Sequence, residues 1–166
     1  IIFLYLISTS LSYSIERPDI KNIVINKELK SYKNVIFKDI NNKDINLENY
    51  RDKLIIINFW ATWCTPCLKE IPAFVEFYNE KSDYVEILGL DFEPVNLPVI
   101  NAFIDRFSVN YPIVLYTDTN DSQYSNFGEI VGMPTTLIYS PEGELLQTFM
   151  GEITIEDLDK YISPIS

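Results

Sequence analysis

The sequence contains no histidine and only two cysteines among its 166 residues, Cys64 and Cys67. A zinc site needs about four ligands, which are normally cysteine and histidine side chains. This chain offers only half of such a set, so a zinc site is disfavoured. The sequence also carries no nicotinamide-binding or flavin-binding motif, and we therefore expect neither a metal ion nor an organic cofactor.

Positive charge is scarce as well. The 13 lysine and arginine residues are outnumbered by 24 aspartate and glutamate residues, which gives a formal net charge of -11. Binding to nucleic acid depends on clustered basic side chains that neutralise phosphates, and the few basic residues here are scattered. We predict no nucleic-acid partner and an acidic surface that keeps the protein soluble.

The apolar content predicts one globular domain. Hydrophobic residues make up 47% of the chain, which contains no repeat or low-complexity tract, so one packed core can form. We place the folded domain at residues 34–166, preceded by a linker or N-terminal edge element at residues 15–33. Residues 1–14 combine an apolar run, too short to span a bilayer, with small residues, and are interpreted as a partial signal peptide or anchor. The expected location is periplasmic, secreted or tethered to the membrane.

The two cysteines lie three positions apart in segment 60–67 (WATWCTPC), directly after a strongly apolar stretch. Two thiols at this spacing can close into a small disulfide ring and reopen, and a strand-to-helix turn would put one sulfur at a helix N-terminus. The alternative is a purely structural disulfide, but such bridges stabilise mainly by closing long loops, and this loop is minimal. The pattern favours a redox-active dithiol formed by Cys64 and Cys67.

Hydrophobic periodicity predicts strands that alternate with helices. The expected strands cover residues 53–60, 84–91, 112–116, 135–139 and 144–150, and the expected helices cover residues 66–82, 97–107 and a last segment opened by Thr154 with Asp157 as its capping partner. Turn residues predict hairpins at residues 41–42 and 140–143. Pro72 lies inside the first helix and predicts a kink there.

These motifs together resemble one family. Segments 60–72 (WATWCTPCLKEIP) and 132–136 (GMPTT), the latter followed by a hairpin, resemble the thioredoxin superfamily and most closely its TlpA/ResA-like (CcmG-like) thiol-disulfide oxidoreductases. The resemblance implies a thioredoxin fold, with a central mixed β-sheet flanked by helices, an added N-terminal β-hairpin and a helical insertion. It also implies that Pro134 is a cis-proline beside the dithiol and that Met133 offers backbone groups to an extended substrate.

The sequence departs from classical thioredoxins in the strand before the motif. Classical thioredoxins have a buried aspartate in this strand, whereas the matching residue here is Asn58. An amide cannot accept the proton of the second thiol. TlpA/ResA-like proteins instead place a glutamate near the start of the insertion, and Glu93 is the nearest candidate. We predict that Glu93 is a catalytic base near Cys67. The alternative is a solvated loop carboxylate.

The two thiols are predicted to have different roles. Cys64 should attack the substrate, because the N–H groups and dipole at a helix start stabilise a thiolate. Cys67, one turn inside the helix, should be more buried and should resolve the mixed disulfide. The flanking residues Trp63, Thr65 and Pro66 are expected to shape the substrate-binding surface around Cys64.

Several functions remain open at this stage. The leading hypothesis is an exported reductase of protein disulfides, for which the resemblance implies apocytochrome c as a substrate and a membrane thiol-disulfide carrier as electron donor. The alternatives are a DsbA-like oxidant and a non-catalytic peptide-binding module or chaperone of the same fold. A peroxiredoxin is a weak alternative, because Ile57 and Ala61 replace the proline and threonine of its Pro-x-x-x-Thr-x-x-Cys motif.

Overall fold

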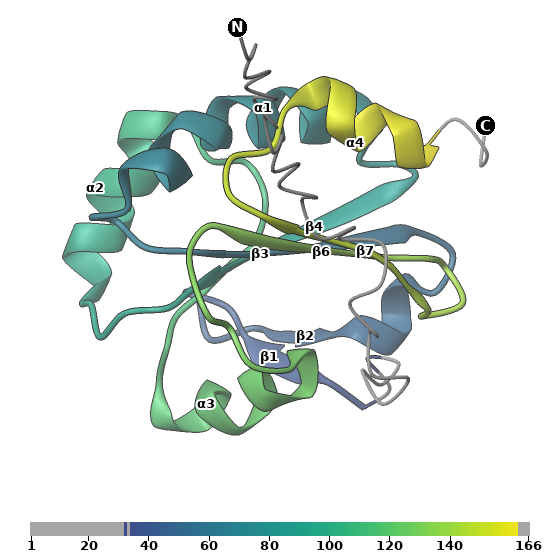
Figure 1. Cartoon of the computed structure of the whole chain (residues 1–166). Helices are drawn as coiled ribbons and strands as arrows, with labels where there is room; N and C mark the ends of the chain where they lie inside the picture. The colour runs from purple at the N-terminus through teal and green to yellow at the C-terminus, as the bar shows by residue number, and fades with distance from the viewer. Residues whose placement is uncertain (1–31, 33, 163–166) are drawn as a thin grey trace, which may run out of the picture.

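A five-stranded sheet separates two layers of the protein (Figure 1). In this computed structural model the described residues are 32 and 34–162, so the predictions for residues 1–14 and nearly all of those for 15–33 lie outside them. The strand order is β5-β4-β3-β6-β7, with β3, β4 and β5 parallel to one another, β6 antiparallel to β3, and β7 antiparallel to β6. The strands are β3 (Leu54–Trp60), β4 (Val85–Asp91), β5 (Ile113–Val114), β6 (Thr135–Tyr139) and β7 (Leu145–Met150). The predicted mixed sheet is confirmed.

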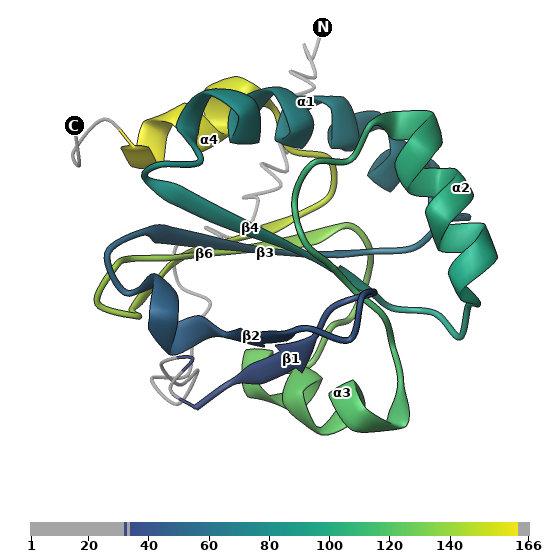
Figure 2. The same cartoon turned by 180° about the vertical axis from the view of Figure 1, so that it is seen from behind.

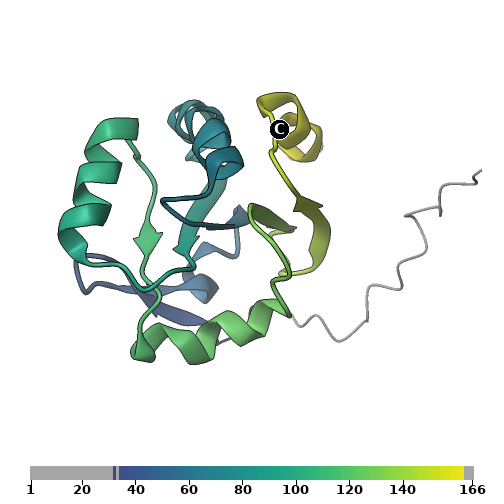
Figure 3. The same ribbon diagram turned by 60° about the vertical axis from the view of Figure 1, so that its left-hand side comes forward.

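Helices α1 (Thr65–Lys81), α2 (Leu97–Phe107) and α4 (Ile155–Ile162) cover one face of the sheet. The other face carries the hairpin of β1 (Ile36–Lys38) and β2 (Asp44–Asn46), together with α3 (Asp118–Tyr124), as the opposite view in Figure 2 shows. Two short 3-10 helices, η2 (Leu47–Tyr50) and η3 (Ser125–Phe127), follow β2 and α3. Figure 3 shows the same layers from the side. The N-terminal hairpin and the helix inserted between β4 and β5 agree with the predictions.

The central strands are buried on both sides, because successive side chains point to opposite faces of the sheet. Ile56 and Trp60 of β3 pack toward α1 and α2, whereas Ile57 and Phe59 pack toward the hairpin and α3. Gly89 of β4 allows the close approach of this packing, since a Cβ there would lie 2.6 Å from Cδ1 of Ile113. The continuous apolar run of β3 therefore serves two cores, one on each face of the sheet.

Helix α3 is the element that sequence reasoning missed, because six of its seven residues are polar and only Tyr124 is aromatic. Asn120 holds it in place: its side chain accepts a hydrogen bond from the backbone N–H of Lys38 (3.0 Å) and donates to the carbonyls of Lys38 and Leu115 (both 3.1 Å). These partners lie in β1 and after β5, so only the tertiary fold brings them to the helix. Helix α3 is therefore held by the long-range polar contacts of Asn120 and by the buried ring of Tyr124, not by an apolar periodicity.

Two sequence patterns in the helical layer concern Pro72 of α1 and the start of α4. Helix α1 continues through Pro72, which lies at an exposed position, and the kink there stays a prediction. At the start of α4, the N–H of Asp157 donates to Oγ1 of Thr154 and the N–H of Thr154 donates to Oδ2 of Asp157, both at 3.3 Å. This reciprocal pair confirms the predicted capping box.

None of the helices in the described part of the chain combines the length and apolar content that a membrane span requires.

Candidate active site

The dithiol lies where β3 passes into α1. Cys64 caps the helix: its Sγ accepts a hydrogen bond from the backbone N–H of Cys67 at 3.4 Å. Pro66 lies in the first turn of α1, where a missing N–H leaves no intrahelical bond unmade. Cys64 therefore lies at the positive end of the helix dipole, as predicted.

Cys64 and Cys67 are joined by a disulfide, with an S–S distance of 2.04 Å. The side chain of Cys67 is completely buried, whereas Cys64 keeps 4% of its surface exposed. Cys64 is thus the more accessible residue of the pair, and a thiol or disulfide of another molecule reaches it before it can reach Cys67.

The surface around Cys64 contains the predicted contact residues. Trp63 is 66% exposed, and Thr65 and Pro66 are exposed as well. Exposure of a large indole beside a reactive sulfur gives an apolar contact for an incoming polypeptide. Their role in substrate binding stays a prediction.

The loop before β6 forms the other border of the site. The Met133–Pro134 peptide bond is cis, as expected, and the pairing of Phe59 with Thr135 places this loop beside the end of β3. The carbonyl of Pro134 accepts a hydrogen bond from the N–H of Gly151 at 2.9 Å. Within residues 32 and 34–162, neither backbone polar group of Met133 has a hydrogen-bond partner, so both can pair with an extended chain.

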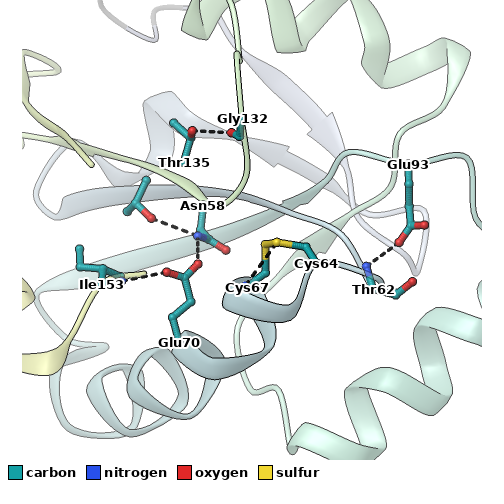
Figure 4. The surroundings of a disulfide bond; sticks show 10 residues. Asn58, Thr62, Cys64, Cys67, Glu70, Glu93, Gly132, Thr135 and Ile153 are labelled. Carbon is teal, nitrogen blue, oxygen red and sulfur yellow. Dashed lines mark hydrogen bonds between the residues drawn. A yellow bond between two sulfur atoms is a disulfide. The ribbon is translucent and has the colours of Figure 1, made fainter. Parts of the chain in front are cut away.

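The buried acid of the site is Glu70, which lies one helical turn after Cys67 on α1 and is only 1% exposed. Its Oε1 accepts a hydrogen bond from Nδ2 of Asn58 at 2.8 Å, and its Oε2 accepts one from the N–H of Ile153 at 3.1 Å. Burial raises the pKa of Glu70 to about 7, although these two hydrogen bonds act in the opposite direction. Figure 4 shows this carboxyl on the Cys67 side of the disulfide. The position that the sequence assigned to Glu93 is therefore occupied by Glu70.

Sequence reasoning missed Glu70 because the apolar periodicity of α1 does not mark a carboxylate as buried. The periodicity of Leu68, Ile71, Val75 and Tyr78 indicates one apolar face. The buried positions are Cys67, Glu70, Ile71, Phe74 and Phe77, and Leu68, Val75 and Tyr78 are partly buried against the same core. Helix α1 has apolar residues on both sides of this face, so the pattern alone does not locate it. The usable signal was the spacing of three residues between Cys67 and an acidic residue.

Glu93 lies on the opposite side of the disulfide, next to the loop before Cys64 (Figure 4). It is half-buried, and its Oε1 accepts a hydrogen bond from the backbone N–H of Thr62 at 2.5 Å. The strand register explains this placement: Trp60 pairs with Asp91 in parallel strands, so the residues two positions later, Thr62 and Glu93, also lie side by side. The structure does not place Glu93 beside Cys67, and this part of the prediction is corrected.

A second buried carboxyl, Asp91, ends β4 next to Trp60. It is 0% exposed, and neither of its carboxyl oxygens has a hydrogen-bond partner within the described residues. Burial and the nearby charge of Glu93 raise the pKa of Asp91 to about 8, so this side chain is mostly neutral at pH 7. No group of three or more His, Cys, Asp or Glu side chains in this described part is placed to hold a metal ion.

Asp91 gives a test of this burial. Because its pKa is higher in the folded protein than the ordinary value of 3.8, its contribution to stability is fully present below about pH 4 and is lost as the pH rises toward 8. The free energy of unfolding should fall between pH 5 and pH 8, and we expect this fall to be about 1–3 kcal/mol smaller in Asp91→Asn than in the unchanged protein. Urea unfolding of the oxidised protein across this range measures the effect. The exposed Asp105→Asn is the control, and equal pH slopes for all three proteins would contradict the assignment.

The fold and the site together define a class: a thioredoxin-fold protein whose redox dithiol lies at the start of a helix, opposite a cis-proline. Three comparisons agree with this class. The model of the AhpC/TSA family matches residues 24–148. The thiol-disulfide oxidoreductase ResA of Bacillus thuringiensis subsp. konkukian is 31% identical over 138 residues, which cover 82% of this chain and 78% of that protein.

ResA of Bacillus subtilis is 34% identical over 133 residues, covering 80% of this chain and 72% of that protein. The crystal structure of StoA from Bacillus subtilis is similar with a TM-score of 0.64 and 30% identity, covering 76% of this chain and 93% of that chain. The chain therefore belongs to the AhpC/TSA family and is a TlpA/ResA-like thiol-disulfide oxidoreductase of the thioredoxin superfamily. The predicted fold and enzyme class are confirmed.

Proposed function

We propose that this enzyme is an exported reductase of protein disulfides. The observation that carries the proposal is the buried Glu70 on the Cys67 side of the disulfide, because its pKa of about 7 suits it to accept a proton at neutral pH. A base at Cys67 promotes attack by the second thiol. In a reductase that attack is the step that releases the substrate in its reduced form, and the reduction potential of the pair sets the direction in which the exchange runs.

The first step is attack by Cys64 on the substrate disulfide. In the reduced enzyme the thiolate of Cys64 is stabilised by the start of α1 and forms a bond to one substrate sulfur, while the other substrate sulfur leaves as a thiolate. The unpaired backbone groups of Met133 align the substrate chain beside this sulfur. Trp63 supplies an exposed apolar contact.

The second step is resolution by Cys67. Glu70 takes the proton of the Cys67 thiol, and the resulting thiolate attacks Sγ of Cys64. A Cys64–Cys67 disulfide forms, the mixed disulfide breaks, and the substrate leaves with its second sulfur as a thiolate. Two electrons have then passed from enzyme to substrate. An external dithiol must reduce the enzyme again before the next cycle.

Asn58 and Glu93 act through other residues. Asn58 donates to Glu70 at 2.8 Å and to Oγ1 of Thr136 at 3.0 Å, so it holds the carboxyl in position beneath the dithiol. Glu93 binds the N–H of Thr62 and so restrains the loop that leads to Cys64. We therefore assign proton transfer to Glu70 and the positioning of this loop to Glu93.

The cellular role is a finer part of the same proposal. The apolar run in residues 1–14 supports export or tethering to a membrane. The resemblance to TlpA/ResA-like proteins supports apocytochrome c as a substrate and a membrane thiol-disulfide carrier as electron donor. In that role the enzyme would reduce the disulfide between the two cysteines to which haem is attached.

The reduction potential of the Cys64–Cys67 pair tests the direction of electron flow. Equilibration with glutathione buffers, followed by alkylation of free thiols and mass spectrometry, measures it. We expect a potential below about -220 mV, near thioredoxin rather than the strongly oxidising value of about -120 mV. A value near the oxidising end would instead identify a DsbA-like oxidant. Absence of turnover with every protein disulfide tested would favour a binding module or chaperone.

A further inference from the structure

A cavity of about 480 Å³ lies beyond the carboxyl ends of β4 and β5, on the α3 side of the sheet. It is separate from the dithiol, since neither cysteine lines it. Three of its lining residues are aromatic, namely Phe92, Tyr116 and Tyr124, and two are acidic, namely Asp121 and Glu129. The mechanism described above uses none of these five side chains.

The aromatic part of the cavity is a fixed cluster. The ring centroids of Phe92 and Tyr116 are 5.5 Å apart, those of Phe92 and Tyr124 are 5.8 Å apart, and those of Tyr116 and Tyr124 are 5.4 Å apart. The hydroxyl of Tyr124 donates to the carbonyl of Asp91 at 2.8 Å, which anchors the cluster to the end of β4. Tyr124 is only 4% exposed and Phe92 stacks on it, so the accessible aromatic surface belongs to Tyr116, which is 37% exposed, and to part of Phe92. Such rings favour a cation or the aliphatic stem that carries one.

The acidic part of the cavity adds negative charge. Asp121 and Glu129 are both exposed, and neither forms an ion pair with any residue in the described ranges. The carboxylate of Asp121 accepts a hydrogen bond from Tyr116, and this bond raises the pKa of the Tyr116 phenol. No lysine or arginine lines the cavity. Its charge and its aromatic walls are therefore complementary to a guanidinium or ammonium group on an apolar stem.

Two segments connect this cavity to the dithiol. The N–H of Phe92 donates to the carbonyl of Trp60 at 2.9 Å, four residues before Cys64. On the other side, the lining residues Gly128 to Ile130 lead directly into the Met133–Pro134 loop. The cavity thus lies at the same end of the sheet as the dithiol, within reach of a polypeptide bound there.

We infer that this cavity binds an arginine or lysine side chain of the substrate protein, close in sequence to the disulfide that the enzyme reduces. The effect of this cavity on turnover rests on the proposed function. Binding of the cation does not depend on the proposed function. The inference predicts that the enzyme prefers basic substrates more strongly than its overall negative charge alone would cause.

The binding arm of the test uses a cysteine-free peptide with one arginine and the same peptide with citrulline, which keeps the shape and loses the charge. Titration of the oxidised full chain, followed by NMR or calorimetry, is expected to give about 5-fold tighter binding of the arginine peptide at low salt. The double variant Asp121→Asn, Glu129→Gln should lose this preference. The matched control, Asp105→Asn with Glu156→Gln, removes two exposed charges elsewhere and should keep it.

The kinetic arm uses disulfide peptides that carry arginine or citrulline at successive positions beside the disulfide. At least one arginine position should raise kcat/KM for reduction about 5-fold over citrulline, and only the cavity variant should lose this gain. Equal binding of both cysteine-free peptides, or an equal loss of preference in the control variant, would overturn the inference. Arginine binding without any disulfide reduction would count against the proposed function and leave the cavity assignment standing.

Discussion

Cys67→Ser is expected to accumulate a mixed disulfide between Cys64 and the substrate, close to one substrate per enzyme, and to abolish turnover. The physical reason is access: Cys64, at the start of α1, is 4% exposed, whereas Cys67 is completely buried and is the only other thiol of the chain. Without that thiol the first bond forms and cannot be resolved within the enzyme. Intact-mass spectrometry under non-reducing conditions measures the trapped complex.

The matched variant is Cys64→Ser, which should form no such complex and should also lose turnover. Both variants are expected to fold, because a disulfide that closes so short a loop contributes little to stability through chain entropy. Circular dichroism and thermal unfolding of both proteins check this point. If Cys64→Ser trapped the substrate and Cys67→Ser did not, the assignment of the attacking thiol would be reversed.

Glu70→Gln is expected to slow resolution of the mixed disulfide by about 100-fold at pH 7, because the amide cannot take the proton of Cys67. The initial attack by Cys64 should change little, so the mixed disulfide should build up transiently. The variant should also lose the inflection near pH 7 in the rate of resolution, since that inflection belongs to the Glu70 carboxyl. Rapid mixing with acid quench, at pH values from 5.5 to 9, separates the two steps.

The substitution is suited to the site. Glu70 accepts hydrogen bonds from Asn58 and Ile153, and a glutamine oxygen can keep one of these. The Oδ1 atom of Asn58 is buried without a partner within the described residues, so rotation of that amide would provide an acceptor for the new NH₂ group. Loss of the pH inflection without global unfolding is therefore a specific readout. A rate profile identical to that of the unchanged enzyme would remove Glu70 from proton transfer.

The stability of this variant gives an independent check of the same pKa. The raised pKa of Glu70 means that the folded protein holds a proton which the unfolded chain has lost, so stability falls as the pH rises from about 4.5 through 7. Glu70→Gln should remove that part of the pH dependence. Glu93→Gln should retain it, because Glu93 contacts the loop at Thr62 and not the buried pocket.

Local signals in the sequence were sufficient for much of the fold. The β-branched run of β3 can bury both of its faces only inside a sheet, and Thr154 with Asp157 forms its capping box within four residues. Each of these features depends on residues that are close together in the chain. The boundaries of β3, β4, α2 and β6 accordingly differ little from the predicted ranges.

The cavity on the α3 side could not be predicted from local signals in the sequence. Its lining comes from the segment after β4, the segment after β5, α3 with η3, and the loop that leads to Pro134. The aromatic residues Phe92, Tyr116 and Tyr124 have no common spacing in the sequence that would group them. Only the packing of the polar helix α3, held by Asn120 against β1, brings them together.

The sequence by itself determined the dithiol, its position at the start of a helix, the proline opposite it and the family to which these motifs belong, because each is a short pattern with a local physical meaning. Only the tertiary structure decided which acid serves the dithiol. Glu93 follows β4 and lies beside Thr62 because parallel strands keep their register, whereas Glu70 lies beneath Cys67 because α1 turns that face toward the sheet. A carboxyl acquires a pKa near 7 through burial, and burial is a property of the packed fold rather than of the sequence around it.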